Sequence, residues 1–194
     1  MMAHDKNKGW LSVPGIREKA DRTLEEQTHG LEHAYAEAQG ASVLDLGCAE
    51  GLIGREFAKR GAVRVLGLEL LKDHIDVARK ACADFPQMEF QHTNLFYHSQ
   101  TVHPEPFDIV LALSVIHKMP VPETLLRWAA KSAMKLLLLR APKWAHKGTM
   151  IHSKHYNGSV CDTVKVMESE GFEHIRTINN SRNEPLHYWR RKDL

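Results

Sequence analysis

Cysteine is scarce in this chain, and long apolar runs are missing. The three cysteines, Cys48, Cys82 and Cys161, form no CxxC pair. So few, and an odd number, do not make a disulfide framework, so we expect a reducing, cytoplasmic location. The most apolar run, residues 133–139, contains a lysine and is far shorter than the roughly 20 residues of a membrane helix. Because the first eight residues also lack the apolar stretch of a signal peptide, we expect no membrane partner.

A large excess of charge of either sign is also missing. Lysine and arginine number 26 against 24 acidic residues, which gives a net charge of +2 with neutral histidines. This balance leaves a nucleic-acid partner possible but does not indicate one. With 194 residues, 43% of them hydrophobic, the chain suits one domain over residues 1–194. We expect residues 1–20 to form an N-terminal arm or flap, and the sequence leaves the oligomeric state open.

Hydrophobic periodicity predicts that strands and helices alternate along the chain. Strands are predicted at residues 42–46, 63–68, 88–92, 107–112, 135–139, 173–179 and 186–191. Helices are predicted at residues 21–39, 52–59, 72–84, 122–131 and 158–170. This alternation is typical of an α/β fold with a doubly wound, mainly parallel, seven-stranded sheet. The polar turn at residues 180–184 predicts that the last two strands form a C-terminal antiparallel hairpin.

The most informative segment, residues 43–54, reads Val-Leu-Asp-Leu-Gly-Cys-Ala-Glu-Gly-Leu-Ile-Gly. It predicts a strand, a tight turn and the start of a helix. Gly47 and Gly51 allow close approach of a ligand to the backbone, and the N–H groups that open the helix point toward the turn. Such a turn suits a nucleotide-like ligand. Asp45, at the end of the strand, would repel a pyrophosphate but can pair with the ammonium group of an amino acid.

This segment resembles the first motif of the class I S-adenosylmethionine-dependent methyltransferases, Asp/Glu-x-Gly-x-Gly-x-Gly, with Ala49 at the middle glycine. The resemblance implies a Rossmann-like methyltransferase fold and S-adenosylmethionine as the cofactor. Glu69, at the end of the second predicted strand, would accept hydrogen bonds from both ribose hydroxyls. Together with Asp45 it favours this cofactor over a dinucleotide. The expected cofactor-binding residues are Asp45, Gly47, Cys48, Ala49, Gly51, Glu69, Leu70, Asn94, Leu95 and Ser114.

The resemblance also suggests roles for residues further along the chain. Leu70 would cover one face of the adenine, and Asn94 stands where the family often has an adenine-binding Asp, although a turn-capping role is an alternative. Residues 107–117 resemble the fourth motif, which places Ser114 on the sulfonium side. His117 is the candidate catalytic residue because imidazole titrates near neutrality and can take a proton from an acceptor, and packing is the alternative.

The region that binds the methyl acceptor is less clearly marked. Residues 140–157 follow the last parallel strand and form a candidate substrate wall or a plain solvated loop. Trp10 and Arg17, in the predicted flap, are further candidates, and either Arg17 or Arg22 could reach the cofactor carboxylate. His152 and His155 are spaced as i and i+3, but no nearby acid or cysteine completes a metal site, so we expect no metal. The acceptor-binding candidates are Trp10, Arg17, Lys143, His152, His155 and Tyr156.

The segment after the fourth strand also restricts the acceptor. It lacks the Asn/Asp-Pro-Pro-Tyr/Phe signature of enzymes that methylate amide or base nitrogens, and it has no cysteine for a covalent route to pyrimidine carbon-5. We therefore expect methyl transfer to a hydroxyl or amine of a small molecule or sugar. An RNA methyltransferase and a non-catalytic cofactor-binding partner subunit remain alternatives. A nicotinamide oxidoreductase would need a turn that accepts phosphate, which Asp45 opposes.

Overall fold

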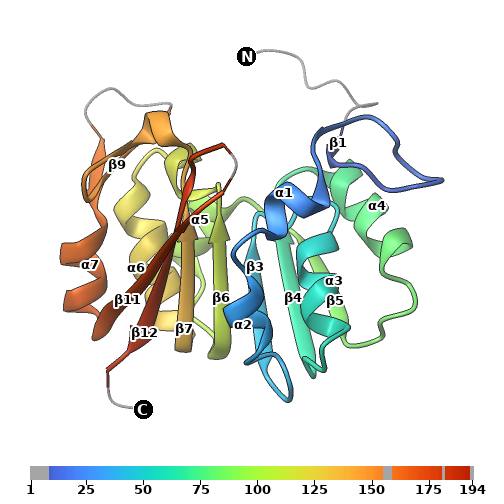
Figure 1. Cartoon of the computed structure of the whole chain (residues 1–194), viewed down its shortest axis with the longest axis horizontal. Coiled ribbons are helices and arrows are strands. Elements are labelled where there is room, and N and C mark those ends of the chain that lie inside the picture. Colours follow the sequence, from blue (N-terminus) through green and yellow to red (C-terminus); the bar gives the residue numbers. More distant parts are fainter. Residues whose placement is uncertain (1–8, 155–158, 181, 193–194) are drawn as a thin grey trace.

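The computed structural model describes residues 9–154, 159–180 and 182–192. Its centre is a seven-stranded sheet in the order β11-β12-β7-β6-β3-β4-β5. The strands are β3 (Ser42–Leu46), β4 (Arg64–Glu69), β5 (Met88–His92), β6 (Phe107–Leu113), β7 (Ala133–Arg140), β11 (Phe172–Asn179) and β12 (Pro185–Arg191). The first five are parallel, whereas β12 is antiparallel to both β7 and β11. The predicted sheet and its terminal hairpin are confirmed (Figure 1).

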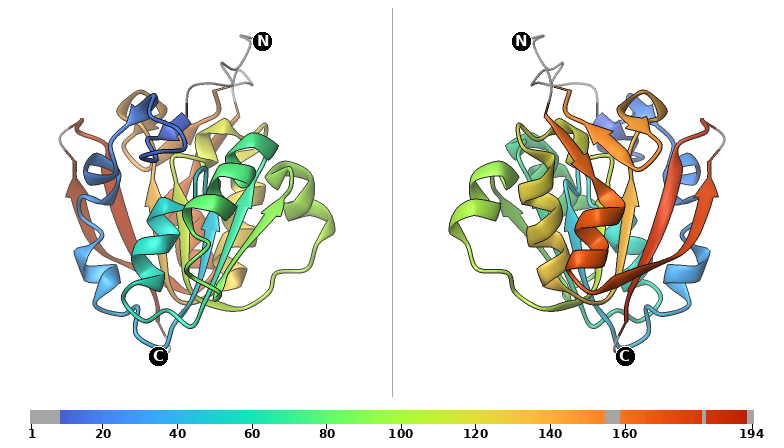
Figure 2. Two further views of the ribbon diagram at one scale, coloured as in Figure 1. Left: turned by 90° about the vertical axis from the view of Figure 1, so that its right-hand side faces the viewer. Right: turned by 90° about the vertical axis from the view of Figure 1, so that its left-hand side faces the viewer.

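Helices cover both faces of the sheet (Figure 2). One face packs against α5 (Leu95–Thr101), α6 (Pro122–Ser132) and α7 (Thr163–Ser169). The other packs against α1 (Leu24–Thr28), α2 (Glu32–Tyr35), α3 (Leu52–Ala58) and α4 (Lys72–Ala81). Along β7, Leu137 and Leu139 belong to the first core, and Leu136 and Leu138 to the second. Successive side chains of a strand point to opposite faces, so a strand covered on both sides has an uninterrupted apolar run.

The N-terminal region differs from the single helix predicted over residues 21–39. It contains β2 (Ala20–Arg22), then α1 and α2, and β2 pairs in parallel with β1 (Gly9–Leu11). Gly30 separates the two helices with a φ of +85°. This left-handed conformation cannot continue an α-helix and suits glycine. The long-helix prediction was wrong because helical spacing of apolar residues continued across this break.

Two further segments were missed or only partly predicted. Helix α5 was not predicted; its N-cap is Asn94, whose side chain accepts a hydrogen bond from the Phe96 N–H at 3.0 Å. The region after β7 contains short elements rather than a simple loop: η2 (Lys143–Ala145), β8 (His146–Lys147) and β9 (Met150–His152). With β10 (Val160–Asp162), β8 and β9 form a three-stranded antiparallel sheet, so α7 begins later than predicted. A three-residue strand is too short to produce a recognisable alternation.

Candidate functional site

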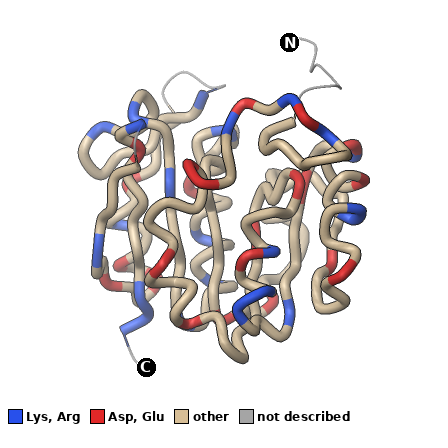
Figure 3. Tube along the Cα trace, turned by 45° about the vertical axis from the view of Figure 1, so that its right-hand side comes forward, with Lys and Arg blue, Asp and Glu red and all other residues tan. Residues whose placement is uncertain are grey.

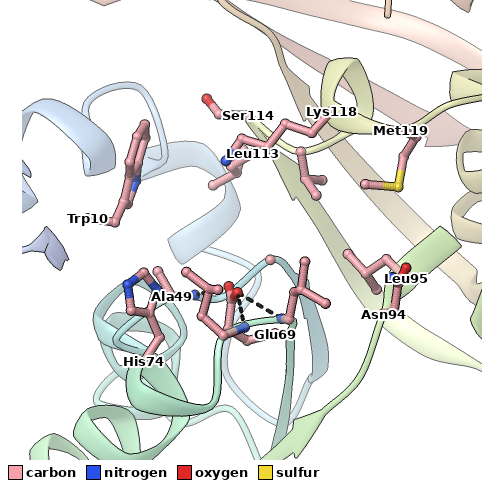
Figure 4. Close-up of a pocket in the computed structure, with 14 residues that line it drawn as sticks. Trp10, Ala49, Glu69, His74, Asn94, Leu95, Leu113, Ser114, Lys118 and Met119 are labelled. Carbon is pink, nitrogen blue, oxygen red and sulfur yellow. Dashed lines mark hydrogen bonds between the residues drawn. The ribbon is translucent and has the colours of Figure 1, made fainter. Parts of the chain in front are cut away.

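A cavity of about 310 Å³ opens at the carboxyl ends of β3, β4, β5 and β6, in the volume range of small-molecule sites. Figure 4 shows Trp10 and His74 at one end, Asn94 and Leu95 at the other, and Glu69 between them. The cavity is lined by Trp10, Gly47, Ala49, Glu69, Leu70, Leu71, His74, Asn94, Leu95, Leu113, Ser114, Val115, Lys118 and Met119. We call it the strand-end cavity. Loops at this edge of an open α/β sheet are where ligands bind.

The turn after β3 brings bare backbone to this cavity. Gly47 has a φ of +76°, and a Cβ there would lie 3.1 Å from Val115 Cγ2. Gly51, with a φ of +72°, would place a Cβ only 2.6 Å from Phe90 Cε1. Ala49 and Ser114, both on the cavity wall, hold left-handed conformations with φ of 48° and 60°. Such conformations are costly for residues with a Cβ and concentrate at functional sites.

Glu69 is the carboxylate that faces the cavity. Its Oε2 accepts a hydrogen bond from the Ala49 N–H at 3.0 Å, and its Oε1 accepts from the N–H groups of Leu70 and Leu71 at 2.8 and 2.9 Å. These bonds, drawn in Figure 4, fix both oxygens. A carboxylate offers about four lone-pair sites, so these three donors leave capacity for a hydroxyl donor from the cavity.

Asp45 lies behind the cavity wall rather than on it. It is 3% exposed, and burial, together with the nearby charge of Glu69, raises its pKa to about 7. Cys48 and Gly51 also lie outside the lining residues. Of the ten predicted cofactor-binding residues, seven therefore line the strand-end cavity, whereas Asp45, Cys48 and Gly51 do not.

The N-terminal segment closes one end of the cavity with Trp10. Glu50, which is completely buried, accepts hydrogen bonds from the N–H groups of Trp10 and Leu11, both at 2.9 Å. Arg17 donates to Glu50 at 3.2 Å and to Asp73 at 3.1 Å. The predicted flap is thus fastened to the turn by Glu50, and Arg17 belongs to this fastening and not to the lining. Sequence reasoning missed Glu50, although an acid inside the glycine turn was a visible signal.

Lys118 is a second residue that sequence reasoning missed. Its Nζ lies 5.1 Å from the centre of the Trp10 ring, and Arg22 Cζ lies 5.3 Å from the same ring. Burial lowers the pKa of Lys118, and the charge of Glu69 partly opposes this. Its position directly after the predicted catalytic histidine was the only sequence signal. Lys118 thus brings a cation into an otherwise mostly apolar wall.

Asn94, Leu70 and Ser114 all line the strand-end cavity. Asn94 also caps α5, so both roles considered for it are compatible. Leu70 is 53% exposed, as expected of an apolar side chain beside an open site. Leu95 follows Asn94 at the start of the helix and lines the same end.

His117 lies in η1 (Ile116–Lys118) and is 4% exposed. It is not among the lining residues of the strand-end cavity; its ring meets that of Trp144 nearly at right angles, with centroids 5.3 Å apart. Trp144 and Lys143 line a second, more open cavity of about 490 Å³. His152 lies in β9, away from both linings. His155 and Tyr156 fall outside the described residues.

Over residues 9–154, 159–180 and 182–192, no group of three or more His, Cys, Asp or Glu side chains could hold a metal ion. No helix in the same ranges has the length and apolarity to cross a membrane. Lys and Arg are interspersed with Asp and Glu along the trace (Figure 3).

Sequence comparison connects the turn and the strands around it to known enzymes. A family profile described as a methyltransferase domain matches residues 43–135. The ubiquinone biosynthesis O-methyltransferase of Azoarcus sp. is 35% identical over 95 residues, 48% of this chain and 40% of that protein. The enzyme of the same name from Aliivibrio fischeri is 32% identical over 93 residues, 47% of this chain and 39% of that protein. The chain therefore spans about two fifths of the length of these relatives.

Comparison of structures covers more of the chain. The magnesium protoporphyrin IX methyltransferase of Synechocystis, solved with S-adenosylhomocysteine, matches 86% of this chain and 84% of its own, with a TM-score of 0.65 and 22% identity. The N-terminal domain of EvdMO1, solved with S-adenosylhomocysteine and D-fucose, matches 93% of this chain and 88% of its own. Its TM-score is 0.66 and its identity 18%. At these identities the likeness shows the fold. In its fold, its glycine turn and the matched family profile, the chain is similar to the class I S-adenosylmethionine-dependent methyltransferases.

Proposed function

We propose that the chain binds S-adenosylmethionine in the strand-end cavity and transfers its methyl group to a hydroxyl or amine of a small molecule. The observation that carries this proposal is Glu69, which is held by three backbone N–H groups while it lines the cavity. A fixed carboxylate beside a bare glycine turn suits a hydroxyl donor of a ribose. It disfavours a phosphate-rich ligand because the charges repel.

The two ends of the cavity fit the two ends of this cofactor. Asn94, Leu70 and Leu95 offer an amide and apolar surface at the end proposed for the adenine. Trp10 and Ser114 stand toward the other end, which we assign to the amino-acid portion. Asp45, behind the cavity wall, adds a buried acid next to the glycine turn.

The chain's own contribution to the reaction is alignment and exclusion of water. The bound cofactor supplies a methyl group already activated by a positive sulfonium. Trp10 covers the cavity, and Val115 and Met119 give its wall apolar surface. Holding two reactants in line in a dry site can account for most of the acceleration of such a transfer. We propose His117 as the group that takes the acceptor's proton.

The acceptor is proposed to be a small molecule, and the names of the relatives favour a hydroxyl oxygen over an amine nitrogen as its reacting atom. The relatives that match slightly less than half of this chain are named O-methyltransferases. The near balance of charge, and the mixture of acidic and basic residues along the described trace, support a small molecule over nucleic acid.

Two measurements test the proposal. Calorimetry should show binding of S-adenosylmethionine and S-adenosylhomocysteine and no binding of NADH. Methyl-labelled cofactor, incubated with a panel of phenols, sugars and amines, should then label a product. Binding of NADH without binding of S-adenosylmethionine would contradict the cofactor assignment. Cofactor binding with no labelled product from any acceptor class would instead favour the partner-subunit alternative.

A further inference from the structure

The second cavity is built from three segments that are remote in sequence. Arg22 ends β2, residues 142–144 follow β7, and Arg182 and Glu184 belong to the turn between β11 and β12. It is lined by Arg22, Pro142, Lys143, Trp144, Arg182 and Glu184. We call it the cationic cavity, because three of the six lining residues are basic and one is acidic.

The ion pairs around the cationic cavity leave an excess of positive charge. Arg22 pairs with Glu184 at 3.0 Å, and Arg182 pairs with Glu26 at 3.2 Å. Within residues 9–154, 159–180 and 182–192, Lys143 has no ion pair. The Nη1 of Arg22 is buried and finds no hydrogen-bond acceptor in the same part of the chain. The Lys143 ammonium and Arg22 Nη1 are both suited to donate hydrogen bonds to an anionic ligand.

Trp144 adds an aromatic surface to the same cavity. It is 57% exposed, although a large aromatic ring is usually covered in a folded chain. An exposed ring in a cavity wall is a platform for a planar ligand, because stacked aromatic pairs gain about 0.5 to 1.5 kcal/mol beyond their area burial.

The cationic cavity adjoins the strand-end cavity through two contacts. Arg22 lies over the ring of Trp10, which lines the strand-end cavity. Trp144 lies against His117, whose neighbour Lys118 lines that same cavity. A molecule seated on Trp144 is therefore close to the end of the strand-end cavity that holds Trp10 and Ser114. This is the end assigned above to the amino-acid portion of the cofactor, whose sulfonium carries the methyl group.

We infer that the cationic cavity binds the methyl acceptor and that the acceptor is an aromatic anion, with its ring on Trp144 and its carboxylate or phosphate near Lys143. This inference rests on the proposed function for the identity of the reaction, but the binding it predicts is measurable without turnover. It also gives Lys143 a specific role in selecting the acceptor.

The test compares two probes that differ only in charge. 4-Hydroxybenzoate and 4-hydroxybenzamide share a ring and a hydroxyl, and both are titrated by calorimetry into the chain saturated with S-adenosylhomocysteine. The benzoate is expected to bind up to about 5-fold more tightly, because a charge pair at an exposed lysine contributes up to about 1 kcal/mol. Phenyl phosphate is titrated beside them, and the tighter of the two anions identifies the preferred anionic group.

Matched variants locate the binding. Lys143→Glu should weaken benzoate binding about 10-fold or more and leave the benzamide unchanged. Lys147→Glu is the control, because Lys147 is an exposed lysine on the neighbouring β8 and does not line the cavity. Trp144→Ala should weaken both probes by a similar factor, since stacking does not depend on the ligand's charge.

Several results would overturn the inference. These are equal affinity for benzoate and benzamide, equal effects of Lys143→Glu and Lys147→Glu, unchanged binding in Trp144→Ala, or no binding of either probe up to about 10 mM. Titration of S-adenosylhomocysteine alone is a separate measurement on the same variants. If it binds and the aromatic probes do not, the inference fails while the cofactor assignment stands.

Discussion

The strand-end cavity takes its wall from the ends of neighbouring strands, whereas the cationic cavity is assembled from the N-terminal region, the segment after β7 and the C-terminal turn. In the first, backbone N–H groups fix the key carboxylate, Glu69. In the second, long side chains hold one another through two ion pairs, of which Arg22–Glu184 is largely buried and Arg182–Glu26 is partly exposed. A side chain fixed by backbone N–H groups has little freedom of position, whereas long side chains that contact one another through ion pairs have more. We therefore expect the cofactor side to be rigid and the acceptor side to adapt.

The largest effect is expected from a substitution of Glu50, which fastens Trp10 over the strand-end cavity. Glu50→Ala removes the acceptor of two buried N–H groups and one partner of Arg17. Removing one partner of a buried ion pair costs about 3 to 5 kcal/mol, so we expect a loss of this size in the free energy of unfolding, measured in urea.

Glu105→Ala is the control for this variant. Glu105 is paired with Arg64 at the surface, where its side chain is 53% exposed. Exposed pairs contribute about 0 to 1 kcal/mol, so this variant should remain nearly as stable as the parent. Equal losses in the two variants would show that Glu50 does not fasten the N-terminal segment.

Asp45 gives the second largest effect, through pH. Burial and Glu69 raise its pKa in the folded chain from an ordinary 3.8 to about 7. The unfolded chain therefore loses this proton first, and stability falls as pH rises from about 4 to about 7. A difference of roughly three pH units corresponds to about 4 kcal/mol. In urea titrations across this range, Asp45→Asn should lack this part of the decline, and parallel pH profiles would contradict the raised pKa.

His117 tests whether the boundary between the two cavities takes part in the chemistry. If its imidazole accepts a proton, His117→Ala should lower turnover by about 100-fold and leave cofactor affinity unchanged. Single-turnover rates with an identified acceptor, together with calorimetry of the cofactor, measure both quantities. A normal rate combined with a lower melting temperature would instead show that the ring only packs against Trp144.

The contrast between the cavities also explains what the sequence could predict. Residues 43–54 and Glu69 were informative because a strand, a glycine turn and an acid at the end of the next strand are close in sequence and have few possible arrangements. The sheet was predicted for the same reason, since its strands have clear apolar runs. Asp45 was expected to contact the ligand directly, but it is buried behind the cavity wall. Sequence spacing cannot distinguish a residue that lines a cavity from one that lies behind the lining.

The cationic cavity could not be predicted in this way. Lys143 was singled out as a possible acceptor contact, but its neighbours Arg22 and Arg182 reach it only through the packing of three remote segments. Helix α5 was missed because only one of its residues, Leu95, is buried, so it shows little amphipathic pattern. The fastening by Glu50 depends on Trp10 and Leu11, some forty residues earlier, and no local pattern reveals such a contact.

The smallest expected effect is the change in cofactor affinity of Glu69 variants. Glu69→Ala removes the acceptor proposed for the ribose, so calorimetry with S-adenosylhomocysteine should show a loss of about 1.5 to 3 kcal/mol, the value of a hydrogen bond to a charged group. Glu69→Gln keeps one oxygen to accept from the backbone but loses the charge, and should lie between the parent and Glu69→Ala. If the backbone contacts of Glu69 keep the strand-end cavity rigid, Glu69→Ala should also lower the melting temperature more than Lys143→Ala does. A folded Glu69→Ala variant with unchanged affinity would place the cofactor elsewhere, and equal melting temperatures would remove the contrast between a rigid cofactor side and an adaptable acceptor side.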